Sequence, residues 1–223
     1  MGLTKTDFMR GMQCEKMLWL DRHHPELKEI SPETIKLLED GNRFGDLAMG
    51  IFGPYTEVKE YYPNTTIPNK MEMARKTREL LDLHTPVVCE AAFMDDFGNY
   101  CAVDILKYND YSNSYDLFEV KNCPSVEIQH IKDATFQAEL LKRIGLNINN
   151  VFIIYHGNDN AYPFVIENIT NSTSEYANYI KDNLGRLNVV KNQESEPLCE
   201  MGEQCDNPYE CWYYHYCLSK KEH

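Results

Sequence analysis

An acid and a base lie two positions apart in the segment DLFEVKN (116–122), which otherwise has the composition of a buried strand. Residues two apart on a strand share a face, so Glu119 and Lys121 are expected to project together. A second apolar segment, CAVDILKY (101–108), carries Asp104. If the two segments form a hairpin, Asp104 lies beside Glu119 on one face of the sheet.

This arrangement would suit metal-assisted chemistry on a phosphate. Two poorly solvated carboxylates that lie close together resist ionisation unless a cation neutralises them. Mg²⁺ or Mn²⁺ would do so, because hard cations prefer oxygen ligands. Lys121 could then deprotonate a water at the metal or stabilise charge on a phosphate. The alternative is an exposed cross-strand ion pair of Lys121, worth about 0.5 kcal/mol.

The elements that must position these residues begin with helices. Start signals predict three helices in the first part of the chain: one over about 5–21 behind a capping-box pattern at Thr4 and Asp7, one after the N-cap Ser31 with Pro32 at its first position, and one from Asn69. After residue 86 the composition changes to short β-type segments separated by turn residues.

The second half of the chain alternates strands and helices. Strands are predicted at 87–94, 99–108, 115–122, 150–157 and 162–168, with helices at 127–145 and from about 171. In the helix at 127–145 the residues at core spacing are Ile128, Ile131, Thr135, Ala138 and Ile144. This order predicts an α/β fold, a mixed central sheet flanked by helices. We expect one domain (1–223), with a helical part (1–85), a sheet core (86–170) and a C-terminal helix with a cysteine-rich tail (171–223).

Composition bounds the class of protein. The formal charge of −13 argues against a surface that grips nucleic acid everywhere, although it permits a local basic track. The longest apolar run, 151–155, is far shorter than the roughly 20 residues of a membrane span. We therefore expect a cytoplasmic protein with no membrane partner.

The catalytic pattern resembles a known superfamily. AVD (102–104), then fourteen residues, then EVK (119–121), then a helix bearing Gln137, is similar to the PD-(D/E)XK nucleases in their RecB-like branch. The resemblance implies a restriction-endonuclease-like fold. It also implies that Asp104 and Glu119 bind the metal with the Val120 carbonyl, that Lys121 is catalytic, and that Gln137 belongs to the site.

The chain departs from the RecB-like pattern at three places. Val103 stands where the superfamily name has proline, and Leu141 stands where a tyrosine would follow Gln137. A Gly-x-x-x-His motif would begin at Gly41, but Gly45 replaces its histidine. The third side-chain metal ligand is therefore open; the candidates are water, Glu90, Asp46 and Glu39.

The cysteines suggest a second cofactor. Four of them recur every six residues, at Cys199, Cys205, Cys211 and Cys217, while Cys14 lies at the other end of the chain. Gaps of five residues are loose for zinc, whereas iron–sulfur clusters accept varied spacing if four thiolates converge. Spacing alone does not choose the four, since the tail could close by itself. The remaining cysteines, which fall in or beside predicted strands, are expected to be small core residues: Cys89, Cys101 and Cys123.

A resemblance selects among these cysteines. RecB-like nucleases of the AddB type and the CRISPR-adaptation nucleases carry one cysteine before the nuclease core and three after it, the last two separated by five residues. The segments FMRGMQC (8–14) and CDNPYECWYYHYC (205–217) are similar to those elements. The resemblance implies a [4Fe–4S] cluster on Cys14, Cys205, Cys211 and Cys217. The wide gap after Cys205 departs from the two-residue gap usual there, which leaves Cys199 as a spare or as the ligand in place of Cys205.

These interpretations lead to one functional expectation and two alternatives. We expect a Mg²⁺- or Mn²⁺-dependent DNA nuclease that acts on single-stranded DNA or DNA ends, in repair, phage or CRISPR settings. Basic residues that could contact phosphate are few, which suggests weak affinity and a helper protein; they are Lys107, Lys121, Lys132, Lys142 and Arg143. The alternatives are a nuclease-fold binding or assembly module that has lost its activity, and a zinc protein unrelated to nucleases.

Overall fold

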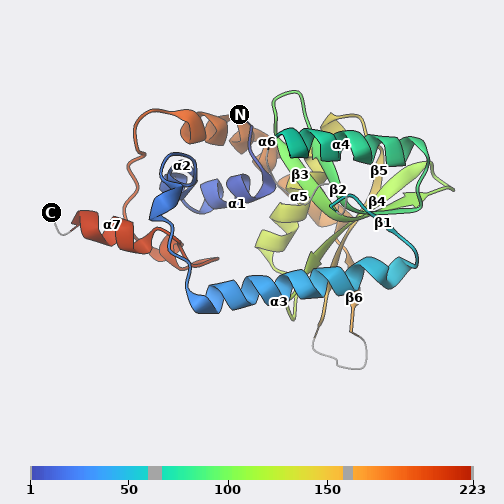
Figure 1. The fold of residues 1–223 in the computed structure, drawn as a ribbon, viewed down its shortest axis with the longest axis horizontal. Coiled ribbons are helices and arrows are strands. Elements are labelled where there is room, and N and C mark those ends of the chain that lie inside the picture. Colours follow the sequence, from blue (N-terminus) through green and yellow to red (C-terminus); the bar gives the residue numbers. More distant parts are fainter. Residues whose placement is uncertain (1, 60–66, 158–162, 222–223) are drawn as a thin grey trace.

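The chain folds as an α/β protein around a six-stranded mixed sheet (Figure 1). The computed structural model describes residues 2–59, 67–157 and 163–221. The strands, in spatial as well as sequence order, are β1 (Thr56–Glu57), β2 (Val87–Met94), β3 (Tyr100–Asn109), β4 (Ser114–Lys121), β5 (Ile148–Tyr155) and β6 (Val165–Asn168). The α-helices are α1 (Lys5–Gln13), α2 (Glu15–His23), α3 (Pro32–Ala48), α4 (Ile67–Asp82), α5 (Ile128–Arg143), α6 (Thr170–Asn192) and α7 (Tyr214–Lys221).

The sheet topology confirms the predicted hairpin. Strands β2, β3 and β4 form an antiparallel meander, and β4 then pairs in parallel with β5 across the α5 crossover. Strand β6 returns antiparallel to β5. The short strand β1, which the sequence analysis did not predict, adds in parallel to β2 at the other edge. The strand predicted at 162–168 starts at Val165 among the described residues; Tyr162 lies outside them.

Helices cover the sheet and connect it to the tail. Helix α5 packs on the sheet with a nearly continuous buried stretch from Asp133 to Leu141. Figure 1 shows α4 along the upper part of the sheet and α3 running from the region of the tail toward the sheet. The prediction that Ile128 is a core residue is wrong: it is 56% exposed at the first turn of α5. No helix in the described ranges is long and apolar enough to cross a membrane.

The single helix predicted over 5–21 is wrong, because the chain breaks at Cys14. Cys14 has an extended backbone (φ −156°, ψ 118°), so it ends α1 and precedes α2. The break lets α2 fold back beside α1, and both pack on α6. Gly11 permits this approach, since a Cβ there would lie 2.7 Å from a methyl group of Leu18 and 2.9 Å from one of Leu187. Burial of apolar side chains on both helices outweighs the continuity of one long helix.

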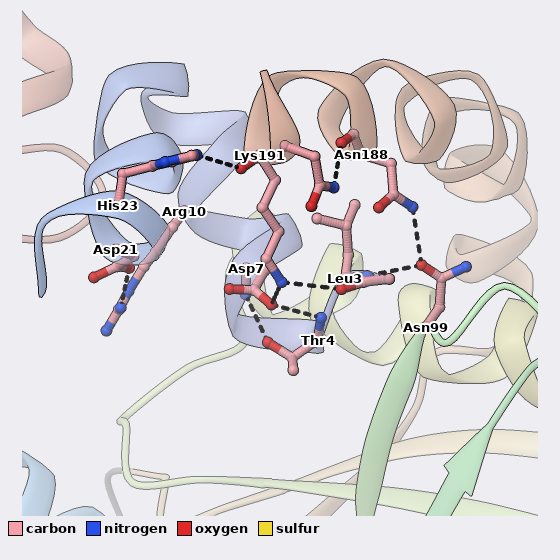
Figure 2. A network of polar contacts seen from close by, with 11 residues as sticks. Leu3, Thr4, Asp7, Arg10, Asp21, His23, Asn99, Asn188 and Lys191 are labelled. Carbon is pink, nitrogen blue, oxygen red and sulfur yellow. Dashed lines mark hydrogen bonds and ion pairs between the residues drawn. The ribbon is translucent and has the colours of Figure 1, made fainter. Parts of the chain in front are cut away.

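The start of α1 is fastened to two distant elements (Figure 2). The predicted capping box is present, with Thr4 and Asp7 each accepting a hydrogen bond from the other's backbone N–H. The backbone N–H of Leu3 donates to Asn99 Oδ1 (2.9 Å), in the turn between β2 and β3. Lys191 Nζ, from the end of α6, lies 2.8 Å from Asp7 Oδ2 and donates to the Gly2 carbonyl (2.9 Å). These contacts fix where α1 begins.

The buried Lys191–Asp7 pair predicts a measurable loss of stability when it is broken. Lys191→Met removes the charge and keeps most of the side-chain volume. We expect the free energy of unfolding at pH 7 to fall by roughly 2–4 kcal/mol, measured by urea denaturation, because Asp7 stays largely buried without its partner. The control is Lys181→Met on the same helix, whose ammonium is half-exposed where it pairs with Glu139 and should cost about 0.5 kcal/mol. Equal losses in the two variants would contradict this account.

The same pair sets a pH dependence. Burial raises the pKa of the Asp7 carboxyl, but the hydrogen bond and charge of Lys191 outweigh it and hold that pKa below its ordinary value. A carboxyl with a lowered folded-state pKa stabilises the fold above its unfolded pKa of about 4, and this contribution is lost as the pH falls. The stability difference between wild type and Lys191→Met should therefore narrow below about pH 4.

Candidate functional site

Three carboxylates come from neighbouring strands of the meander. The β2–β3 register places Glu90 opposite Asp104, and the β3–β4 register, extended by one step, places Asp104 opposite Glu119. The strands deviate from regular pairing here: Glu90 has a positive φ of 51°, and Asp104 Oδ2 accepts a hydrogen bond from the Val120 N–H (2.7 Å). The predicted proximity of Asp104 and Glu119 is confirmed, and Glu90 joins them at the same cavity.

Two lysines neutralise Glu119. Lys121 Nζ lies 2.7 Å from Glu119 Oε1, on the strand face that the period-2 argument predicted. Lys5 Nζ, from the first turn of α1, lies 2.8 Å from the same oxygen. Both ammonium groups also pair with Asp133 of α5. Lys5 was not predicted as a site residue, because nothing in its spacing connects it to a glutamate 114 positions away.

Helix α5 completes the surroundings of Glu119. Gln137 is fully buried and donates its side-chain N–H to Glu119 Oε2. Asp133 lies one helical turn earlier, so both side chains project from one face of α5 toward β4. Leu141, at the position of the missing tyrosine, is fully buried in the core. The predicted glutamine therefore reaches the acidic group, and no hydroxyl replaces the tyrosine at that position.

The carboxyl groups differ in their ionisation. Burial and the neighbouring Glu119 carboxylate raise the pKa of Asp104 to about 7. Burial also raises the pKa of Glu90 and of Asp133. For Glu119 the charges of Lys121 and Lys5 outweigh burial and hold its pKa well below the usual range. The site thus contains one firmly ionised carboxylate beside others that resist ionisation, as expected where acids outnumber cations.

A cavity of about 410 Å³ opens over these groups. Helix α3 contributes Gly41, Gly45 and Asp46 to its wall. A Cβ at Gly45 would meet nothing within 4 Å, so there is open space where the resemblance expected a histidine. Of the open candidates for a third ligand, Glu90 and Asp46 line the cavity, whereas Glu39 is an exposed residue of α3 that is not part of its described lining.

The donors of this cavity suit a hard divalent cation. In the described part of the chain, no three His, Cys, Asp or Glu side chains are arranged to hold a metal ion as they stand. The Glu119 carboxylate instead forms ion pairs with Lys5 and Lys121. Two buried oxygens nevertheless lack a hydrogen-bond partner, Asp133 Oδ1 and Gln137 Oε1. Neither residue is part of the described lining of this cavity, whose own oxygen donors, the carboxyl groups of Glu90, Asp104 and Glu119, are of the kind that Mg²⁺ or Mn²⁺ prefers.

The cysteines of the two chain ends lie in one apolar cluster. Cys14, Cys205 and Cys211 pack with Met17 and Trp19 of α2. Cys14 Sγ lies 3.5 Å from Cys199 Sγ, the cysteine that the resemblance left as a spare. Burial raises the pKa of the Cys14 thiol to about 12 and that of Cys211 to about 11. Burial therefore keeps these thiols protonated near neutral pH, and binding of a metal by them would release their protons.

The remaining tail cysteine, Cys217, lies near the same cluster. After burial, the Cys205 and Cys217 thiols also raise the pKa of Cys211.

Of the three cysteines predicted to lie in the core, Cys89 and Cys101 are buried as expected. The prediction for Cys123 is wrong: it is half-buried after the end of β4 and lines the acidic cavity.

The basic residues expected near the site have other partners. Lys132 lies over the ring of Tyr179, Lys142 pairs with Glu139, and Arg143 pairs with Asp95. Among the described lining residues of the acidic cavity, the cations are Lys5, Lys59 and Lys121. Of the predicted phosphate contacts, only Lys121 is therefore brought to the described wall of this cavity.

No family model matches the chain, and no curated protein matches it.

The contact of Gln137 with Glu119 predicts a specific cost of removing it. Gln137→Leu should lower the free energy of unfolding by about 1.5–3 kcal/mol in metal-free buffer, since it removes a hydrogen bond to a buried charged group. Urea denaturation measures this loss. The control is Gln129→Leu, an exposed position two turns earlier on α5, which should change stability by no more than about 0.5 kcal/mol. If Gln137→Leu is as neutral as the control, the hydrogen bond does not stabilise the site.

Proposed function

We propose that the chain is a Mg²⁺- or Mn²⁺-dependent DNA nuclease of the PD-(D/E)XK type, RecB-like branch, that hydrolyses phosphodiesters in single-stranded DNA or at DNA ends. The observation that carries this proposal is the meeting of Asp104, Glu119 and Lys121 at one cavity. Acids from adjacent strands and a lysine on the same face are the groups that this chemistry needs.

The strand order is compatible with the proposed restriction-endonuclease-like fold. An antiparallel meander leads through α5 into the parallel strand β5, and this arrangement presents Asp104 and Glu119 on adjacent strands. Helix α5 adds Gln137 to the same acids. These positions support the RecB-like assignment, and the departures from the pattern are Val103, Gly45 and Leu141.

The metal would be held by Asp104, Glu119 and the Val120 carbonyl, with Glu90 as the side chain best placed to replace the histidine. When bound, the ion would polarise the phosphodiester and lower the pKa of an attacking water. The chain's own residues would do the rest. Lys5 and Lys121 would bind a phosphate oxygen and stabilise its negative charge, and Gln137 would hold Glu119 in position.

The main alternative, an inactive binding or assembly module, is favoured by one observation. Lys5 and Lys121 already compensate Glu119 and Asp133 without a metal. A site that satisfied its own charges could persist for the stability of the fold alone. Cleavage assays with variants of the acidic site decide between the two.

Cleavage should depend on the acid and the lysine. We expect labelled single-stranded DNA to be cut with Mn²⁺ and not with EDTA. Asp104→Asn and Lys121→Met should each lower the rate by about a hundredfold or more. The control is Asp116→Asn. Asp116 is a buried aspartate of β4 that accepts a hydrogen bond from Asn150, and it is not part of the described lining of the acidic cavity. Equal activity in wild type and in both site variants would reject the nuclease and support the inactive module.

We further propose that the clustered thiols bind a [4Fe–4S] cluster. Cys14, Cys211 and Cys217 would supply three ligands, and either Cys205 or Cys199 the fourth. Such a link between Cys14 and the tail would close a loop of roughly 190 residues and stabilise the fold by about 5 kcal/mol in the chain-entropy model. A cytoplasmic location would keep these thiols reduced. The scarcity of cations at the acidic cavity favours a helper protein for DNA binding.

The cofactor can be tested by metal and sulfide analysis of anaerobically purified protein. We expect about four iron atoms and four sulfides per chain, and their loss in Cys14→Ser. Comparison of Cys199→Ser with Cys205→Ser identifies the fourth ligand, because only the ligand variant should lose the cluster. The matched control is Cys123→Ser, outside the thiol cluster. Bound zinc without iron would instead support the zinc protein.

A further inference from the structure

A second cavity, with apolar walls, continues from the acidic one. It has a volume of about 600 Å³, within the range of roughly 300–1,000 Å³ typical of small-molecule sites. The two cavities share five lining residues, namely Lys5, Leu37, Leu38, Lys121 and Tyr209. The lysines that pair with Glu119 therefore stand at the boundary between an acidic cavity and an apolar one.

The apolar residues of this cavity wall come from three separate parts of the chain. Met9 and Met17 come from α1 and α2, the two leucines from α3, and Tyr209 from the tail. Leu37 is 68% exposed, Leu38 48% and Tyr209 50%, so three large apolar side chains at this cavity face solvent. Contiguous exposed apolar surface of this kind marks a binding site more often than a structural need.

Tyr209 is held at the boundary by the chain around it. Gln13 of α1 donates a hydrogen bond to the Tyr209 carbonyl (2.6 Å). The N–H of Cys211 donates to the Cys205 carbonyl (2.8 Å), which closes the base of the loop that carries Tyr209. Tyr209 lines both cavities and is half-exposed, so its side chain lies near the acidic site and is accessible to a ligand.

We propose that the apolar cavity binds the base of the unpaired nucleotide next to the scissile phosphate, with Tyr209 as its stacking surface. This inference rests on the proposed nuclease function and specifies its substrate. A phosphate at Lys5 and Lys121 would have its base within reach of the adjoining cavity. The chain has a net charge of −13, and both lysines already pair with Glu119 and Asp133, so a phosphate would reach them by replacing one of these carboxylate contacts.

The strand state of the substrate follows from the chemistry of the cavity. A base in a duplex is stacked and paired, so it cannot enter an apolar cavity unless it first leaves the stack. Aromatic side chains bind single-stranded bases with little sequence preference, because every base has a π-face. The cavity therefore selects single-stranded DNA or a frayed end. Glu210 also lines the cavity, where it accepts hydrogen bonds from Ser31 and Thr34, and its charge would disfavour a phosphate beside it.

The test compares a twelve-nucleotide oligodeoxythymidine with the same strand carrying one abasic nucleotide at the cleaved position. Binding is measured by fluorescence anisotropy in Ca²⁺ and cleavage in Mn²⁺. For wild type we expect the abasic strand to bind roughly tenfold more weakly. Tyr209→Ala should bind the intact strand roughly tenfold more weakly and no longer distinguish it from the abasic strand, because the residue and the base contribute to the same contact.

The control is Tyr214→Ala, which removes a partly exposed tyrosine of the same tail that is not part of the described lining of this cavity. It should keep the discrimination of wild type, and circular dichroism checks that each variant is folded. Metal-dependent cleavage that is lost in Lys121→Met but unaffected by the abasic site and by Tyr209→Ala would overturn the base site and leave the nuclease standing. Absence of both binding and cleavage in wild type would overturn both proposals.

Discussion

The structure depends on the compensation of one buried negative charge. Glu119 is almost fully buried in the sheet, where an unpaired carboxylate would be costly. Its partners come from three elements: Lys5 from α1, Lys121 from its own strand and Gln137 from α5. These contacts join the N-terminal helix, the meander and the crossover helix at one buried carboxylate.

The position of Lys5 in turn depends on contacts remote from the acidic site. It is the first residue of α1, directly after the capping residue Thr4. The Asp7–Lys191 pair ties this helix start to the end of α6, and the Leu3–Asn99 hydrogen bond ties it to the turn before β3. Partly buried polar contacts between distant segments thus fix the start of α1, and with it the position of Lys5 beside the acidic cavity.

Features that depend on neighbouring residues or adjacent strands could be predicted from the sequence, whereas contacts between distant segments could not. Alternation along strands and turn signals predicted the hairpin of β3 and β4, the shared face of Glu119 and Lys121, and the proximity of Asp104. Those features are local or involve adjacent strands. Lys5 could not be predicted, because its pairing arises from the packing of α1 on α5 and α6. The break at Cys14 was missed for the same reason: its helix propensity was overridden when α1 and α2 folded together around Gly11.

The spacing of the tail cysteines gains a physical explanation from the position of Tyr209. The hydrogen bond between Cys211 and Cys205 closes a loop whose five intervening residues are exposed, and Tyr209 of this loop lines both cavities. Both ends of the loop belong to the cluster that contains the thiols. One segment of the tail therefore contributes both to that cluster and to the wall of the acidic cavity.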